Sequence, residues 1–400
     1  MRTKRADVVV VGGGPSGLRV AGRLAAEGRD VRVLERKPRV GTNVICTGIV
    51  GREAFDDFGL DRGAVIGEIR TVRLVSPRAT VLTYEHPRPF ACVVDRERFD
   101  GGLAESARAA GAGLEFGTTV ERIEIGPEGV VVEARDEGGG PIRLAAAMAV
   151  VASGVDARLQ KSAGLGRARD FLNGAQVEVP ARGGPDPTTI VFGRDLVPGG
   201  FGWAVPAGEG KVRVGLLTSK EPGAALKRMM ETSFGDLARG AEGLPVRTKP
   251  VAQGLITPTF GDRVLSVGEA AGQTKTTTGG GISYGLLCAD LAAEVILEAF
   301  RTSSFGAGGL AEYERRWRRA LEKEIVVGYY TRKMCARLSD GQIEGLFQLA
   351  RTDGIVPIIR EKADFEWHSG LIFALLQRLS FMRPFRAAKD RLVPRDRSLS

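Results

Sequence analysis

The stretch DVVVVGGGPSG, residues 7–17, decides how the first part of this chain folds. Its four valines form a short apolar, β-branched run, which is typical of a buried parallel strand. Three glycines follow in the spacing G-x-G-x-x-G, and the apolar residues after them recur at helical spacing until Gly28. A second strand is predicted over residues 31–36. The stretch therefore predicts one strand–helix–strand unit of the type that binds a dinucleotide.

Each glycine of this spacing has its own physical role. Gly12 permits a tight turn, Gly14 lets a pyrophosphate approach the backbone, and Gly17 allows the helix to pack closely on the strand. The N-terminus of the helix offers N–H donors and a positive dipole end to phosphates. Glu35 closes the second strand and can accept hydrogen bonds from a ribose diol, which argues against a 2′-phosphate on the bound nucleotide.

Composition limits the classes of function. A chain of 400 residues is long enough for two or three modules. Its 55 glycines suggest many tight turns and close backbone approaches, as around a large ligand. The formal charge of +9 suits nucleic acid, an anionic membrane surface or phosphorylated substrates, as well as a plain solvated surface. No nucleic-acid fold signature accompanies this charge, so we predict no nucleic-acid partner.

Cysteine and histidine usage argues against a metal centre. The four cysteines, Cys46, Cys92, Cys288 and Cys335, form no C-x-x-C pair, and the chain has only two histidines. The N-terminus runs from a basic start straight into a strand without a cleavable signal pattern, and no apolar stretch is long enough to span a bilayer. We therefore predict a cytoplasmic protein with reduced thiols and no metal.

The rest of the chain does not continue as regular βα units, as a simple NAD dehydrogenase would. Antiparallel strand patterns occupy residues 69–84 and recur between residues 175 and 217. Downstream, GDRVLSVGEAAGQTKTTTGGGISYGL (261–286) predicts a strand, a glycine- and threonine-rich loop and a second helix N-terminus. Backbone donors there can stabilise negative charge on a reduced flavin. These features favour FAD over NAD as the bound cofactor.

We predict an α/β fold in which a Rossmann-like FAD-binding domain is interleaved with an antiparallel-sheet substrate domain, followed by a helical C-terminal region. The FAD-binding domain is expected at residues 1–68, 93–160 and 245–305, the substrate domain at 69–92 and 161–244, and the helical region at 306–400. The last dozen residues, KDRLVPRDRSLS, have the composition of a polar tail.

Several motifs together resemble the geranylgeranyl reductase family of the hydroxylase-like FAD-dependent oxidoreductases, flavoproteins that saturate isoprenoid double bonds. They span residues 6–290 and comprise GGGPSG with Glu35, the cysteine loop ICTGI, DRERFD (95–100), VVASGVDARLQ, FGWAVPAGEGKVRVGL and GEAAGQTKTTTGGGI. The resemblance implies cofactor contacts by Gly12, Gly14, Pro15, Ser16, Gly17, Glu35, Arg36, Arg96, Thr119, Val120, Gly268, Glu269, Ala271, Gly280, Gly281 and Ile282. It implies substrate contacts by Gly48, Phe201, Trp203, Val205 and Pro206.

The chain departs from the family pattern at two places. Glu269 stands where the family usually has Asp, which binds the ribityl chain, so the longer carboxylate implies a slight shift or a water bridge. In FGWAVP, Phe201 and Val205 replace the Tyr and Phe of the family's Tyr-x-Trp-x-Phe-Pro. The lost hydroxyl and the smaller Val205 leave an apolar, roomier site and put the usual substrate in doubt. For Trp203, ordinary sheet packing is the alternative to substrate contact.

The resemblance implies a reductase that transfers hydride from N5 of reduced flavin to an isoprenoid alkene, with protonation of the other carbon. Cys46 matches the family's loop cysteine and is the candidate proton donor; the alternative is a small residue that shapes a tight loop. The runner-up function is an aromatic or lipid monooxygenase of the same superfamily. Gly272 stands where the related hydroxylases carry His, which favours the reductase.

Partners follow less directly from the sequence. The substrate is expected to be an isoprenoid lipid or a prenyl diphosphate. No second G-x-G-x-x-G unit appears, so either NAD(P)H docks transiently or an electron-transfer protein such as reduced ferredoxin supplies electrons. The apolar segment 367–391 carries flanking basic residues and suits either a helix at a membrane surface or one packed on the FAD domain. His368 is interpreted as a packing or capping residue.

Overall fold

The computed structural model describes residues 4–181, 187–352 and 355–379. Within them, eight strands form the sheet that carries the glycine loop. Its order is β17 (Phe260–Gly261), β18 (Val264–Ser266), β11 (Pro141–Val151), β1 (Lys4–Val11), β2 (Val31–Leu34) and β8 (Gly113–Glu115), with β10 (Val130–Arg135) and β9 (Thr119–Ile125) branching from β11. The pairings from β18 through β11, β1 and β2 to β8 are parallel, whereas β9 and β10 pair antiparallel.

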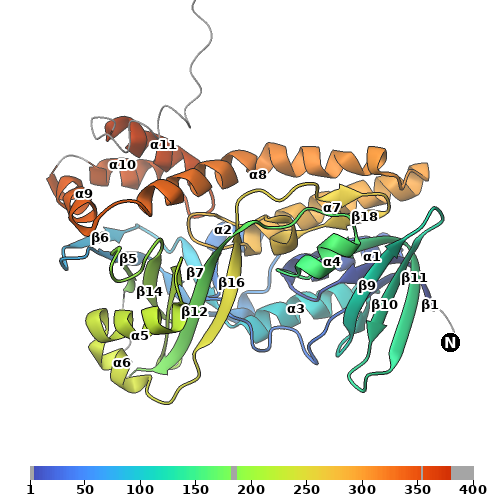
Figure 1. Ribbon diagram of the computed structural model, residues 1–400, viewed down its shortest axis with the longest axis horizontal. Coiled ribbons are helices and arrows are strands. Elements are labelled where there is room, and N and C mark those ends of the chain that lie inside the picture. Colours follow the sequence, from blue (N-terminus) through green and yellow to red (C-terminus); the bar gives the residue numbers. More distant parts are fainter. Residues whose placement is uncertain (1–3, 182–186, 353–354, 380–400) are drawn as a thin grey trace, which may run out of the picture.

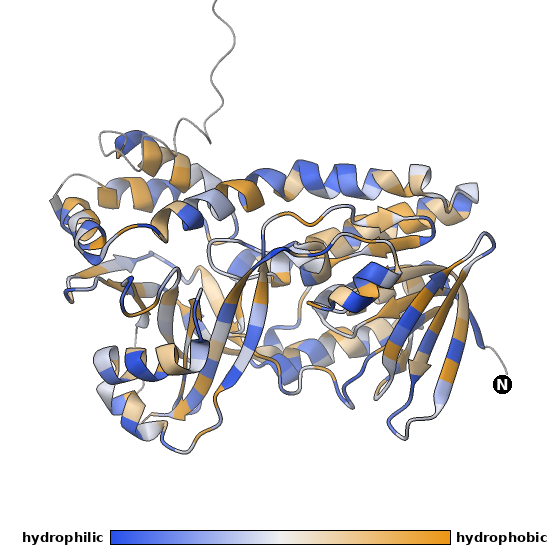
Figure 2. Ribbon diagram, viewed as in Figure 1, coloured by the Kyte–Doolittle hydropathy of each residue, from blue (hydrophilic) through white to orange (hydrophobic). Residues whose placement is uncertain are grey.

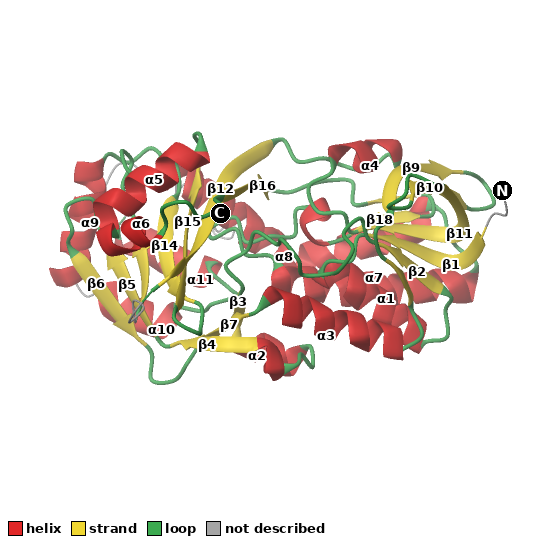
Figure 3. Cartoon of the chain, turned by 90° about the horizontal axis from the view of Figure 1, so that it is seen from below, coloured by secondary structure: helices red, strands yellow, loops and turns green. Residues whose placement is uncertain are grey.

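The valine run of β1 is buried on both faces of this sheet. Val8 and Val10 face a core formed with the helices α1 (Pro15–Ala26), α7 (Ile282–Thr302) and α8 (Ala307–Cys335). Val9 and Val11 face a second core formed with β9, β10 and the short helix α4 (Ala157–Ser162). Because neighbouring side chains of a strand point to opposite faces, a strand covered on both sides is apolar throughout. Figure 3 shows α1, α3 (Arg96–Ala109) and α7 together along one side of the parallel strands.

A second sheet forms the other half of the molecule. In the described residues it has seven strands in the order β16 (Arg247–Gln253), β12 (Asp170–Pro180), β15 (Lys211–Thr218), β14 (Phe201–Pro206), β13 (Thr188–Val191), β5 (Thr71–Val75) and β6 (Val81–Glu85). The helices α5 (Pro222–Ser233) and α6 (Gly235–Gly240) cover one face around Leu226 and Met229. A three-stranded sheet links the two halves and consists of β3 (Ile49–Gly51), β7 (Ala91–Val94) and β4 (Val65–Ile69). The short helix α2 (Arg52–Asp57) directly follows β3.

One predicted boundary is wrong. We placed residue 245 at the return to the FAD-binding domain, but β16 pairs antiparallel with β12 and belongs to the second sheet. The segment RTKPVAQ has only a short apolar pattern, so its pairing partner is not evident from periodicity. The edge of the second sheet therefore reaches Gln253 and lies beside the loop that leads to β18.

The C-terminal part is helical, in agreement with the sequence. After α8 come α9 (Asp340–Thr352), α10 (Ile355–Lys362) and α11 (Ser369–Arg378). Figure 1 shows α8 running along the top of the molecule over both halves, with α9, α10 and α11 above the second sheet. Figure 2 shows polar residues on the outward side of α8. None of the helices in the described ranges is long and apolar enough to cross a membrane. The predicted polar tail lies outside the described residues.

Candidate active site

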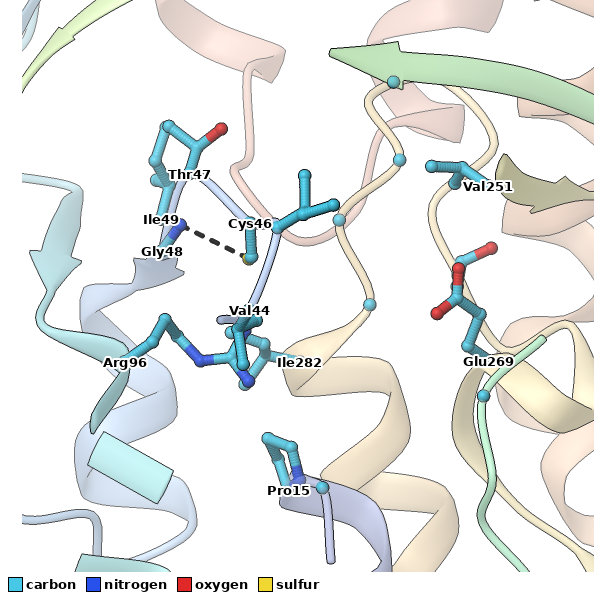
Figure 4. Close-up of a pocket in the computed structure, with 18 of the residues that line it drawn as sticks. Pro15, Val44, Cys46, Thr47, Gly48, Ile49, Arg96, Val251, Glu269 and Ile282 are labelled. Atoms are coloured by element: carbon cyan, nitrogen blue, oxygen red, sulfur yellow. Dashed lines mark hydrogen bonds between the residues drawn. The ribbon is translucent and has the colours of Figure 1, made fainter. Parts of the chain in front are cut away.

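A cavity of about 730 Å³ lies between the two sheets and is lined by both. It begins at the glycine loop between β1 and α1 and extends to the aromatic side chains of β14. Figure 4 shows the loop of Cys46 on one side and Glu269 with Val251 on the other, with Pro15 and Ile282 at the helix ends near them. The cavity thus joins a dinucleotide-binding loop to an apolar pocket.

The glycine loop has the geometry of a phosphate cradle. Gly12 has a φ of 111°, which favours glycine, and a Cβ at Gly17 would lie 2.1 Å from the Gly12 carbonyl oxygen. A Cβ at Gly14, by contrast, would meet no heavy atom within 4 Å. Glu35 holds the loop in place, since Oε2 accepts from Gly13 N at 2.6 Å and Oε1 accepts from Lys37 N at 2.9 Å. Open space above Gly14, at a helix N-terminus, fits a pyrophosphate.

The cysteine loop reaches the cavity through a left-handed glycine. Gly48 has a φ of 76°, and a Cβ there would lie 2.7 Å from the carbonyl oxygen of Val94. Gly48 N donates to Cys46 Sγ at 3.3 Å, which fixes the thiol toward the cavity wall (Figure 4). Only a residue without a side chain lets the loop approach β7 this closely.

A buried arginine lies beside the thiol. Arg96 pairs with Asp100 through two hydrogen bonds of 2.9 and 2.8 Å, and its charge also interacts with the Cys46 side chain. Burial alone would lower the pKa of Arg96, but Asp100 and Cys46 outweigh it, and the pKa lies above its ordinary value. The guanidinium therefore stays charged next to Cys46.

Two side chains of the second sheet anchor this loop. Arg213 on β15 donates through Nη1 to the carbonyl oxygens of Thr47 and Val94 at 2.8 and 3.0 Å. Gln176 on β12 accepts from Thr47 Oγ1 at 3.2 Å and donates to the carbonyl oxygen of Cys46 at 3.4 Å. Both halves of the molecule therefore set the position of Cys46.

Glu269 faces the cavity from the opposite side. Its Oε2 lies 2.9 Å from Nζ of Lys249, a residue of β16 that also lines the cavity. Lys249 was not among the predicted site residues, because a lysine in an edge-strand pattern carries no sequence signal of its own. The ion pair connects the second sheet to the loop of the predicted ribityl contact.

An apolar wall completes the far end. Phe201 and Trp203 on β14 line the cavity with ring centroids 5.7 Å apart, and Val205 lines it too. Nε1 of Trp203 is buried and makes no hydrogen bond within the described part of the chain. Ile190 and Tyr84 extend the wall along β13 and β6. This surface is suited to an apolar chain rather than to a polar ring.

The C-terminal region contributes a wall that the sequence did not predict. Lys275, in the loop before α7, pairs with Glu366 Oε2 at 2.6 Å, donates to the Phe365 carbonyl oxygen at 2.8 Å and lies over the Phe365 ring. Burial lowers the pKa of Lys275, and Glu366 opposes the shift. Glu366 Oε1 in turn accepts from Ser283 Oγ at 2.8 Å and from Gly51 N at 3.2 Å.

His368 also lines the cavity. It stands at the N-cap position of α11 and makes no side-chain cap. Nδ1 lies 2.6 Å from Thr277 Oγ1 and Nε2 lies 3.1 Å from the Phe365 carbonyl oxygen. Because that carbonyl only accepts, we place the hydrogen on Nε2 and let Thr277 donate to Nδ1. Burial and the nearby Lys275 lower the pKa of His368, which favours this neutral form.

Most predicted site residues line this one cavity. These are Gly12, Gly14, Pro15, Ser16, Glu35, Arg36, Cys46, Gly48, Arg96, Thr119, Val120, Phe201, Trp203, Val205, Glu269, Gly280, Gly281 and Ile282. Four do not line it: Gly17, Pro206, Gly268 and Ala271. Gly17 and Gly268 instead allow close packing, since a Cβ at Gly268 would lie 2.5 Å from Ser16 Oγ, and Ala271 is fully buried behind the loop.

The missed residues share a cause. Lys249, Lys275, Phe365 and His368 come from segments far apart in the sequence, and none belongs to a motif with fixed spacing except Lys275. Lys275 stands within GEAAGQTKTTTGGGI, and its position four residues before Gly279, in the glycine-rich approach to the N-terminus of α7, is the one available signal.

Comparisons with known proteins identify the family of this chain. A family model described as an FAD binding domain matches residues 5–171. Digeranylgeranylglycerophospholipid reductase 1 of Methanopyrus kandleri is 32% identical over an alignment of 371 residues that covers 88% of this chain and 98% of that protein. Digeranylgeranylglycerophospholipid reductase 2 of Methanothermobacter thermautotrophicus is 33% identical over an alignment of 360 residues that covers 86% of this chain and 91% of that protein.

A solved structure agrees in fold. The crystal structure of a geranylgeranyl bacteriochlorophyll reductase-like protein from Thermoplasma acidophilum superposes with a TM-score of 0.83 at 22% identity, covering 98% of this chain and 100% of that one. The fold class predicted from the sequence is therefore confirmed, and the open cradle at Gly14 fits the FAD that the matched domain binds. This chain belongs to the geranylgeranyl reductase family of FAD-dependent oxidoreductases.

Proposed function

We propose that this enzyme saturates carbon–carbon double bonds of an isoprenoid chain, with FAD as its redox cofactor. The supporting observation is the single cavity in which the phosphate cradle, the thiol of Cys46 and the apolar wall of β14 meet. The two curated relatives described above are named as reductases of a digeranylgeranyl phospholipid, which supports the same substrate class. The proposal has two forms, in which the isoprenoid chain of the substrate belongs either to a lipid or to a prenyl diphosphate.

We propose a division of labour among the cavity residues. Bound FAD, once reduced, supplies a hydride from N5. Cys46 holds the proton for the other alkene carbon, and Arg96 stabilises the thiolate that remains, because a buried cation favours a neighbouring anion. Phe201, Trp203 and Val205 hold the chain and exclude water. Glu35, Arg36, Thr119 and Val120 remain proposed contacts of the nucleotide end, and Glu269 of the ribityl chain.

The monooxygenase alternative gains no support from the local geometry. Gly272 has a φ of 68°, and a Cβ there would lie 2.8 Å from both Gly254 O and Ile256 Cγ1. The histidine of the related hydroxylases therefore does not fit this loop without a shift of the segment after β16. This geometry favours the reductase.

Anaerobic turnover tests the proposal. The flavin is reduced with dithionite in the absence of oxygen, and geranylgeranyl phospholipid or geranylgeranyl diphosphate is added. We expect flavin reoxidation and a product whose mass has increased by the added hydrogens, with only one of the two substrates turned over efficiently. A Gly14→Val enzyme without FAD is the control. Product that forms only after oxygen is admitted, or that contains oxygen, would contradict the proposal and identify a monooxygenase.

The electron donor and the membrane contact are tested separately. We propose NAD(P)H or reduced ferredoxin as donor, and peripheral contact with membranes through the C-terminal region. Reduction of the bound flavin by NADPH alone at the turnover rate excludes the need for ferredoxin. Flotation of the enzyme with anionic and with neutral liposomes measures the membrane contact, and the absence of flotation with both removes it.

A further inference from the structure

A second cavity, of about 900 Å³, lies outside the FAD site, and the proposed division of labour uses none of its lining residues. It is bounded by residues 165–170 before and at the start of β12, by Gln253 at the end of β16 with residues 254–255 and 257–258 after it, and by Val326, Tyr329 and Tyr330 of α8. Figure 1 shows the upper ends of β12 and β16 converging below α8 at this place. We propose that this cavity binds a nucleotide.

The side chain of Gln253 carries the argument. Gln253 is 3% exposed and lines the cavity, and neither its Nε2 nor its Oε1 has a hydrogen-bond partner within the described residues. Burying both ends of an amide without partners is unfavourable, because each group loses its hydrogen bonds to water, so native proteins rarely leave such groups unpaired. An amide offers one donor and one acceptor side by side. Its complement is a planar edge that accepts and donates, such as the carboxamide of nicotinamide or the aminopyrimidine edge of adenine.

The rest of the lining suits a ring and phosphates. Tyr329 and Tyr330 present rings with centroids 5.4 Å apart, and Tyr330 is 49% exposed, so a planar base can stack against it. Arg167 and Arg169 are exposed at the cavity. The carboxylate in the lining, Asp170, is already engaged by Lys333 at 2.6 Å and Arg332 at 3.2 Å. The free charge offered to a ligand is therefore positive, as a phosphate requires.

The second cavity adjoins the FAD cavity. Val251 lines the first and Gln253 the second, and residues two apart in a strand share one face. Ala252, which lies between these two residues in β16, accepts a hydrogen bond of 3.4 Å from Oγ1 of Thr274, a residue of the FAD cavity. A cavity of this size accommodates one nucleotide-sized ligand. Two ligands carry the ring edge and the phosphates that this site would recognise. NAD(P)H would couple the site to flavin reduction, and an adenine nucleotide would regulate the enzyme.

Calorimetry with the FAD-loaded enzyme tests the proposal and separates the two sources. NADH, NADPH and ATP are titrated, with inorganic phosphate as the control for simple anion binding. We expect saturable binding of at least one nucleotide. Competition decides the source: ATP that displaces NADH identifies the adenine part as the recognised group, and NADH binding that ATP does not affect identifies the nicotinamide part. No saturable nucleotide binding, or binding matched by phosphate alone, overturns the proposal.

Two variants locate the site. Gln253→Leu keeps the size of the side chain and removes its donor and acceptor, so nucleotide affinity should fall by about tenfold. Arg169→Glu, at the exposed rim, should weaken binding similarly without affecting folding, whereas Arg143→Glu, at an exposed position near the start of β11, should leave it unchanged. Unchanged affinity in both cavity variants overturns the proposal. Alkene reduction is measured in parallel with dithionite-reduced wild-type enzyme and with dithionite-reduced Gln253→Leu. Failure of the wild-type enzyme in this assay counts against the proposed reductase and not against this site.

Discussion

Gly14, at the N-cap of α1, and Gly17, in its first turn, are required for different reasons. At Gly14 a side chain would enter the open cradle, and the backbone there, with φ −78° and ψ 175°, suits any residue. At Gly17 a methyl group would collide with the Gly12 carbonyl oxygen. We predict that Gly14→Val folds normally but loses FAD, as measured by flavin absorbance after gel filtration. Gly17→Ala should lose about 1–3 kcal/mol of folding stability even in apoprotein. Equal FAD content in Gly14→Val and wild type would contradict the cradle assignment.

Cys46 is the residue at which chemistry and packing make different predictions. If it donates the proton, Cys46→Ser should retain FAD and fold stably, because serine preserves the size and the contact with Gly48 N. Alkene reduction should slow by roughly a hundredfold, since a hydroxyl is a much weaker acid than a thiol. Single-turnover reoxidation of the reduced enzyme measures this step directly. Cys335→Ser, on the exposed end of α8, is the matched control. Unchanged turnover would leave Cys46 a packing residue.

At the scale of elements, one ion pair joins three segments at the cavity. Lys275 belongs to the loop before α7, Glu366 to the connection between α10 and α11, and Gly51, which also bonds Glu366, to the end of β3. The Lys275 and Glu366 side chains are only 7% and 15% exposed. The C-terminal helices are therefore part of the active-site wall.

This arrangement makes a prediction for stability. Glu366→Gln leaves the buried Lys275 without a counter-charge and should cost roughly 3 kcal/mol in the free energy of unfolding. The double variant Lys275→Met with Glu366→Gln removes both charges and should recover most of that loss, so a double-mutant cycle in urea should show strong coupling. Glu361→Gln, in the exposed pair with Lys362, should change stability by less than about 0.5 kcal/mol. Additive losses in the cycle would exclude the pair as the link.

Local signals account for what the sequence predicted correctly at this scale. The G-x-G-x-x-G loop with Glu35, the hairpin over residues 69–84 and the second helix N-terminus each depend on residues within about thirty positions. The placement of β16 beside β12 and of Phe365 and His368 at the cavity depends on tertiary packing between distant segments. Such contacts have no periodicity or spacing of their own, so pattern reasoning gives no access to them.

At the scale of the whole molecule, the helices α8 to α11 are not an appendage. Trp317 and Tyr313 of α8 are fully buried in the same core as Val8 and Val10 of the first strand. Farther along, Glu344 of α9 accepts hydrogen bonds from Ser76 and Thr80 beside β5 and β6. The helices therefore tie the two sheets together around the cavity.

This continuity predicts one cooperative unfolding transition. Because α8 shares its core with the dinucleotide-binding strands, heating should release FAD and melt the helices at the same temperature, as followed by flavin fluorescence and far-ultraviolet circular dichroism. Trp317→Ala should destabilise the whole molecule by about 3–5 kcal/mol and shift both signals together. Arg316→Ala, one residue away on the outer face, should change the free energy of unfolding by no more than about 0.5 kcal/mol and should shift neither signal appreciably. If Trp317→Ala lost its helix signal while FAD stayed bound to a higher temperature, the helical region would be an independent unit. The packing of α8 on the first strand could then not be what holds Phe365 and His368 at the cavity.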